Sequence, residues 1–216
     1  GAQIIYWLIY KVGKLELLVF CHAILLTSVY ILLLKLSLKT SNNLKVSAFA
    51  TLISIILSLS NFALRPQAFS ILLFTITFYL LKTNRLKFIP FVFLIWANLH
   101  SAFLVGLILI CTHMFEGFDL KKKEFINPDI FSTLLISIVF TILNPFNISL
   151  YFTALNVGPA SSKVTHIMEW MPPSLTNETG IIFFSALTLL LILHLWKRLK
   201  WSITEIMTFL AFTILA

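Results

Sequence analysis

Charged residues are scarce in this chain. They make up 11% of its 216 residues, whereas soluble domains carry about 25%. Hydrophobic residues reach 59%, and the mean hydropathy is +0.99. This composition excludes an ordinary soluble domain, because the chain has too little charge to cover one. It predicts an all-α, polytopic transmembrane helical bundle that forms a single membrane domain over residues 1–216.

Glycine and cysteine are also rare. There are 6 glycines beside 21 phenylalanines, so we expect bulky side chains, rather than Gly-xxx-Gly contacts, to hold the helices together. The two cysteines, Cys21 and Cys111, lie within apolar segments and belong to no zinc or redox motif. The chain starts at Gly1 and ends within the apolar run FLAFTILA, so we expect a fragment truncated at both ends.

The net charge of +8 does not indicate a nucleic-acid partner, because the basic residues stand in short clusters between apolar runs. Basic clusters of this kind usually mark cytoplasmic loops. We therefore place four clusters on the cytoplasmic side: Lys35, Lys39 and Lys45; Lys82, Arg85 and Lys87; residues 121–123; and Lys197, Arg198 and Lys200.

About seven membrane helices are predicted, some of them short or partial. The expected helices cover residues 15–34, 46–64, 67–81, 128–146, 180–196 and the start of one at 202–216. Residues 88–115 fit either one long helix or two short ones, at 88–97 and 102–116. Cytoplasmic clusters on both sides of this stretch require an even number of crossings, which favours two helices with a bend inside LIWANLHS, at residues 98–101.

This topology places the unusual polar segments together on the extracytoplasmic side. They are the N-terminal GAQIIYWLIY, the tripeptide Arg65-Pro66-Gln67, the bend with Asn98 and His100, the turn 144–147, and a predicted extracytoplasmic loop at 148–179. Polar groups within lipid must find partners, and ionisable ones commonly mark functional sites. The sequence therefore predicts an outward-facing polar pocket.

Each candidate residue also has a structural interpretation. Arg65 either extends to the membrane interface or holds a phosphate or carboxylate through its planar guanidinium, with Gln67 orienting it. His100 is either a core histidine bonded to Asn98 or Trp96, or a donor to an anionic leaving group or a proton carrier. No second ligand lies three or four residues from His100, so we expect no metal or other cofactor, and a divalent metal is unsupported.

Residues 144–147 and 156–178 also have two interpretations each. Asn144 and Pro145 are typical of an ordinary helix end, as well as of a polar turn. Residues 156–178 contain prolines typical of a loop around HIMEWMPP. This loop lies either on the membrane surface or over the pocket as a lid, with His166, Glu169 and Trp170 facing the pocket.

The segments RPQAFSILLF, IPFVFLIWANLHSAFLVG, ILNPFN and IMEWMPP follow one another over about residues 60–175. In this order they resemble the GT-C superfamily of polytopic membrane glycosyltransferases, relatives of the protein O-mannosyltransferases and aminoarabinose transferases. The bend is the most specific part, since many members resemble W-A-N-L-H-G-G-F. Ser101 and Ala102 stand here in place of the two glycines.

The resemblance implies transfer of a sugar from a polyprenyl-phosphate lipid to an acceptor, on the outer face of a prokaryotic plasma membrane. Its implied partners are the donor lipid and membrane lipids, with no nucleic acid. Its implied donor-phosphate-binding residues are Arg65, Gln67, Asn98 and His100, while the loop residues His166, Glu169 and Trp170 would close the site. The acidic base of such enzymes lies in a first outer loop, which would precede Gly1, so no catalytic residue is assigned.

Two other function classes remain open. A transporter or flippase-like protein that binds lipid or solute would also gather polar residues in the membrane, but no repeat and no charge at the centre of a span indicates one. A structural subunit would need no functional site. Hydrogen bonds within the packed bundle would then have to explain why Asn98 and His100 are polar.

Overall fold

The computed structural model describes residues 1–117, 126–161, 174–176, 178–197 and 201–215, and within these residues every regular element is a helix and there is no strand. The all-α prediction is confirmed. Two short 3-10 helices, η1 (Leu59–Phe62) and η2 (Leu86–Phe88), accompany the α-helices. The α-helices are α1 (Ala2–Ser41), α2 (Leu44–Leu57), α3 (Gln67–Lys82), α4 (Ile89–Leu99), α5 (Phe103–His113), α6 (Pro128–Ile142), α7 (Ser149–Ser161), α8 (Glu178–Lys197) and α9 (Ile203–Leu215).

Helix length separates α1 from the other apolar helices. Among the described helices, α1 alone is long and apolar enough to cross a membrane unaided, and only 17% of its most apolar stretch is buried. Seven shorter helices contain apolar stretches of 10–17 residues. At a rise of about 1.5 Å per residue these stretches reach at most about 26 Å, slightly less than a hydrocarbon core of about 30 Å.

The ambiguous stretch forms two helices, as predicted. His100 is extended, with φ −155° and ψ 143°, and this ends α4, while α5 starts at Phe103. Pro90 lies in the first turn of α4, where a missing N–H costs no helical hydrogen bond. We call residues 100–102, which join the two helices, the elbow.

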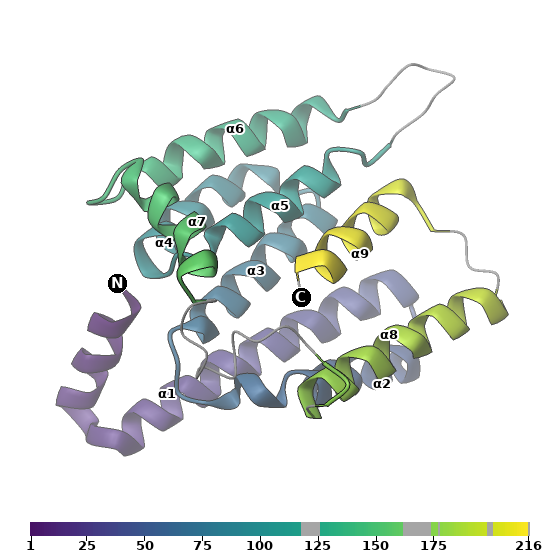
Figure 1. Ribbon diagram of the computed structural model, residues 1–216, viewed down its shortest axis with the longest axis horizontal. Coiled ribbons are helices and arrows are strands. Elements are labelled where there is room, and N and C mark those ends of the chain that lie inside the picture. Colours follow the sequence, from purple (N-terminus) through teal and green to yellow (C-terminus); the bar gives the residue numbers. More distant parts are fainter. Residues whose placement is uncertain (118–125, 162–173, 177, 198–200, 216) are drawn as a thin grey trace.

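Helices α3 and α5 lie at the centre of the bundle. No residue of α3 is exposed. Helix α3 packs against α1, α4 and α5, and α5 also packs against α6 and α9 (Figure 1). The largest fully buried side chains are Trp96, Phe93 and Phe103, where α4 meets α5. The core therefore lies directly beneath the elbow.

The bundle has two chemically different ends. The elbow, the N-terminus and α7 lie toward the left of Figure 1, and we call this the elbow end. The turns after α1 and α3 lie toward the right, and we call this the basic end, because Lys39, Lys45, Lys82, Arg85 and Lys87 lie in or beside these turns.

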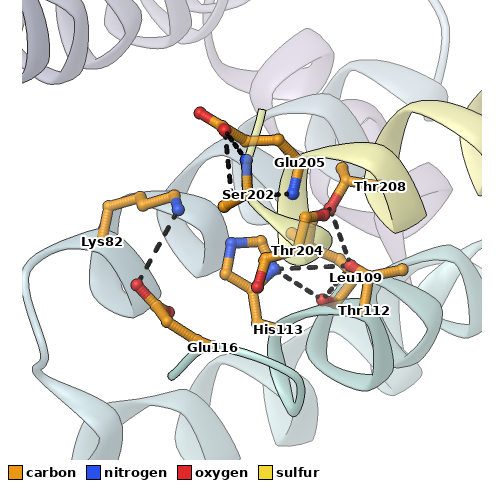
Figure 2. Close-up of polar contacts among 9 residues, drawn as sticks. All are labelled: Lys82, Leu109, Thr112, His113, Glu116, Ser202, Thr204, Glu205 and Thr208. Carbon is orange, nitrogen blue, oxygen red and sulfur yellow. Dashed lines mark hydrogen bonds and ion pairs between the residues drawn. The ribbon is translucent and has the colours of Figure 1, made fainter. Parts of the chain in front are cut away.

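Ionic and capping contacts gather at the basic end. Lys82 Nζ lies 4.0 Å from Glu116 Oε1 (Figure 2). The backbone N–H of Ser202 donates to Glu205 Oε2 at 2.7 Å, while the Glu205 N–H donates to Ser202 Oγ at 3.2 Å. This reciprocal capping box starts α9, whose Thr208 hydroxyl donates to Thr112 of α5 at 3.0 Å.

Residues 148–179 are not a loop throughout, and this part of the prediction is wrong. Residues 149–161 form α7, whose Leu150, Tyr151 and Ala154 pack on the core at helical spacing. The Tyr151 ring meets Phe103 edge to face, with centroids 5.1 Å apart. Gly158 and Pro159, which suggested a loop, fall near the end of α7, where they interrupt little of the helix.

The first helix is longer than predicted and is bent. Its backbone leaves helical geometry at Gly13 and at Lys14, which has φ 52°. The kink divides α1 into a long segment, which contains the predicted residues 15–34, and a short segment at residues 2–12. We call residues 2–12 the arm. The arm turns away from the long segment and brings the N-terminus to the elbow end (Figure 1).

Candidate functional site

Three of the five segments predicted to converge contact one another directly at the elbow end, and residues of or beside the other two pack next to them. Gly1 lies against α4 so closely that a Cβ there would be 1.8 Å from the Asn98 carbonyl oxygen. The Tyr6 hydroxyl donates to the Arg65 carbonyl at 3.0 Å. The Asn98 side-chain amide donates to the Leu143 carbonyl at 3.2 Å, which connects α4 to the end of α6. The fifth segment, residues 148–179, contributes α7, whose Tyr151 ring contacts Phe103.

His100 is held by Ser70 of α3. Its Nδ1 lies 2.9 Å from Ser70 Oγ, and the Ala102 backbone N–H donates to the same nitrogen at 3.3 Å. Ser70 in turn accepts the indole N–H of Trp96 at 2.9 Å. Among the described residues, the His100 ring therefore makes no direct bond to Asn98 or Trp96, although the His100 backbone N–H donates to the Trp96 carbonyl at 2.9 Å. The connection of the ring to Trp96 passes through Ser70.

Burial changes the acid–base behaviour of His100. The ring lies in the elbow, outside the helices, and its partial burial lowers its pKa below the ordinary 6.5. The ring is therefore neutral at pH 7. Within the described part of the chain Nε2 has no hydrogen-bond partner, and it is not sealed in the interior as Nε2 of His22 and Nε2 of His113 are.

Arg65 and Gln67 stand at the start of α3, and both are partly buried. The Arg65 carbonyl accepts the Ala68 N–H at 3.2 Å as well as the Tyr6 hydroxyl. Gln67 precedes Ser70 by three residues, which makes them neighbours on the helix surface. Gln67 therefore lies beside the residue that binds His100, at the positive end of the α3 dipole.

Asn98 and Asn144 have structural partners. The Asn98 amide also donates to the Leu94 carbonyl at 2.8 Å, within its own helix, although the side chain is exposed. Asn144 is buried, and its Oδ1 accepts the Phe146 N–H at 2.7 Å, as in an Asx turn that ends a helix. The ordinary helix-end interpretation of Asn144 fits these contacts.

The predicted lid residues His166, Glu169 and Trp170 lie outside the described residues, so their placement stays a prediction. Among the described residues, no group of three or more His, Cys, Asp or Glu side chains could hold a metal ion.

Sequence reasoning missed Tyr6 and Ser70 as members of this end, and it named Trp96 only as a partner of His100. Their contacts join residues far apart in sequence, and a hydroxyl in an apolar helix gives no signal of its partner. One local signal existed for Ser70, since it follows Gln67 by one helical turn within RPQAFS.

An apolar pocket of about 590 Å³ was also missed. It lies between α2 with η1, α8 and α9, and its walls include Leu57, Leu59, Phe183, Leu187, Leu190 and Phe212.

No protein-family model matches this chain, and no curated protein or solved structure is significantly similar to it. What the elbow end can do therefore follows from its own residues and geometry.

Proposed function

We propose that this chain is a polytopic integral membrane protein of the GT-C glycosyltransferase type. It would transfer a sugar from a polyprenyl-phosphate donor to an acceptor at the extracytoplasmic face of a prokaryotic plasma membrane. The observation that carries the proposal is that the start of α3, with Arg65 and Gln67, lies at the same end of an apolar bundle as His100, which Ser70 of α3 binds, and opposite the basic end (Figure 1).

The distribution of polar and apolar side chains supports residence in lipid. Every described α-helix except α3 and α5 exposes large apolar side chains, including Phe20, Phe49, Phe91 and Phe152. Many small hydroxyl residues are buried instead, and most of these donate to carbonyls of their own helices, as Thr77 does to Leu73 at 2.8 Å. Apolar surfaces around a hydroxyl-lined interior suit hydrocarbon better than water.

The arm supports an interfacial position for the elbow end. Trp7 and Tyr10 are about half exposed, and the Lys11 ammonium lies 4.1 Å from the Trp7 ring centroid. Aromatic residues beside lysines are enriched where membrane meets water. If the basic end faces the cytoplasm, the arm and the elbow lie at the opposite interface.

The same residues suit a lipid phosphate. A guanidinium offers paired donors to phosphate oxygens, and the N-terminus of α3 adds a favourable dipole. Neutral His100 can add a ring N–H without the cost of burying another charge. The apolar pocket between α2, α8 and α9 would take part of the isoprenoid chain of the same lipid.

The test is binding of undecaprenyl phosphate to the chain in nanodiscs, measured by native mass spectrometry. Replacement of Arg65 by Ala should weaken binding about tenfold or more, the effect of losing a charge-assisted hydrogen bond of about 1.5–3 kcal/mol. Arg85→Ala is the matched control, because Arg85 is exposed at the basic end. Equal effects of the two substitutions, or none, would argue against the donor site.

A lipid-binding or flippase-like protein without transferase activity is the second candidate. The apolar pocket of about 590 Å³ between α2, α8 and α9 favours it, because a lipid chain would fit there without any transfer reaction. Sugar transfer by the full-length protein, lost in Arg65→Ala and His100→Ala together, would select the transferase. Lipid binding without any transfer would select the binding protein.

A further inference from the structure

We infer that Ser70 and Trp96 are positioning residues that hold His100 with its ring proton on Nε2, so that His100 presents a hydrogen-bond donor at the elbow end. The ligand assigned to this donor, a phosphate oxygen, rests on the proposed function. The assignment of the ring proton to Nε2 does not rest on the proposed function.

The direction of the hydrogen bonds follows from counting protons. The Trp96 indole nitrogen can only donate, so Ser70 Oγ accepts from it at 2.9 Å. Ser70 has one hydroxyl proton to give, and His100 Nδ1 lies 2.9 Å from its oxygen. The Ala102 N–H also points at Nδ1. Both neighbours of Nδ1 therefore bring a proton, and Nδ1 is the acceptor.

The opposite tautomer would leave two groups unsatisfied. A proton on Nδ1 would face the Ala102 N–H, and Ser70 would then have to accept from both Trp96 and His100. The Ser70 hydroxyl proton would need another acceptor, although the side chain is only 7% exposed. A buried donor without a partner is unfavourable, so the Nε2 tautomer is preferred.

His22 provides an internal reference with the reverse arrangement. The Tyr6 hydroxyl gives its one proton to the Arg65 carbonyl at 3.0 Å. Its 2.9 Å bond to His22 Nδ1 must therefore be donated by the ring. The same proton count thus assigns the Nδ1 tautomer to His22 and the Nε2 tautomer to His100.

The functional consequence concerns what His100 can do for a ligand. With Nδ1 occupied and Nε2 protonated, the neutral ring donates one hydrogen bond and has no lone pair to offer outside. It therefore suits an oxygen acceptor, such as a phosphate oxygen of a lipid headgroup, and not the hydroxyl of a sugar acceptor that must lose a proton.

The experiment is nitrogen-15 NMR of the histidine rings in the whole chain, in nanodiscs at alkaline pH, where protonated and bare ring nitrogens have well separated shifts. His100→Gln and His22→Gln assign the signals. The variants are Ser70→Ala and Trp96→Phe, with Ser70→Thr as the control that keeps the hydroxyl. Thermal melting of each variant, followed by circular dichroism, checks that the bundle remains folded.

We expect Nε2 to be protonated in wild-type His100 and Nδ1 in His22. Ser70→Ala should shift the His100 tautomer ratio toward Nδ1–H about fivefold, the size of one neutral hydrogen bond. Trp96→Phe should shift the ratio the same way, because Ser70 Oγ no longer accepts from the indole and is then free to accept from a proton on His100 Nδ1. Ser70→Thr should keep the wild-type ratio, and the His22 ratio should stay unchanged throughout.

Protonated Nδ1 in wild-type His100, or an unchanged ratio in both Ser70→Ala and Trp96→Phe, would overturn the inference. Added undecaprenyl phosphate tests the ligand separately. A shift of the His100 Nε2 signal, with the His22 signals constant, supports a phosphate ligand. The absence of that shift overturns the phosphate ligand and leaves the tautomer result intact.

Discussion

At the scale of the residue, His100 illustrates how this chain accommodates a polar ring in an apolar setting. The ring does not lie in the middle of a helix, where it would need a partner in hydrocarbon. It stands where α4 has ended, next to Ser70 on the neighbouring helix. Its neutral state removes the cost of burying a charge.

The lowered pKa of His100 predicts a pH dependence. Folding disfavours the charged ring, so the unfolded chain takes up the proton first as the pH falls. The contribution of His100 to stability should be present above the ordinary pKa of 6.5 and should be lost as the pH drops through the lower pKa of the folded state. Thermal melting of wild type and His100→Gln in detergent, at a series of pH values, measures this contribution. If the melting temperature of wild type rises relative to that of His100→Gln as the pH falls, the prediction is contradicted.

Gly106 permits the close contact between α4 and α5 beneath the elbow. A Cβ at this position would lie 2.4 Å from Trp96 Cζ3 and 2.9 Å from Phe93 Cζ, in a fully packed core. We expect Gly106→Ala to lower the free energy of unfolding by about 1–3 kcal/mol, as overpacking does.

A double-mutant cycle with Trp96→Phe is the control for Gly106→Ala, because the smaller ring removes the clashing atom. Thermal or denaturant melts of the four proteins supply the cycle. If Gly106→Ala costs as much in the Trp96→Phe background as in wild type, the clash with Trp96 is not its cause.

Residue identity was predictable for part of the site. Arg65, Gln67 and His100 could be named because an isolated cationic, amide or imidazole side chain stands out in an apolar chain. Ser70 could not be named, because nothing in the sequence distinguishes it from hydroxyl residues, such as Thr75, that bond to a carbonyl of their own helix. Only the fold brings Ser70 to His100, 30 residues away.

At the scale of the element, one hydroxyl makes two side-chain hydrogen bonds between the arm and the rest of the described chain. Tyr6 connects the arm to the Arg65 carbonyl and to His22, whereas Tyr10 is about half exposed. Tyr6→Phe should speed amide hydrogen exchange over residues 2–12 about fivefold or more, because it removes two hydrogen bonds. Tyr10→Phe should leave exchange in the arm unchanged. Equal exchange in the two variants would mean that other contacts hold the arm.

Helix boundaries were predictable where charge or proline marks them. The start of α3 follows Pro66, and the division of residues 88–115 followed from lysine clusters on either side. Helix α7 was missed because Gly158 and Pro159 suggested a loop, although the apolar residues before them, such as Leu150 and Ala154, have helical spacing. The bend at Lys14 was missed because a positive φ at lysine leaves no sequence signal.

At the scale of the whole molecule, the central claim is that a bundle with large apolar side chains on its surface lies in a membrane with its elbow end outside. All-helical architecture and one helix long enough to span a bilayer agree with this claim. Antiparallel packing separates the elbow from the basic end by the length of the bundle (Figure 1).

The most direct measurement is cysteine labelling in intact cells with a membrane-impermeant thiol reagent. Single cysteines replace Ser101 at the elbow and Lys87 at the basic end, in a chain where Cys21 and Cys111 are Ala. The account predicts that position 101 reacts from outside and that position 87 reacts only after the membrane is opened. Reaction at position 87 in intact cells, or at position 101 only after opening, would contradict it.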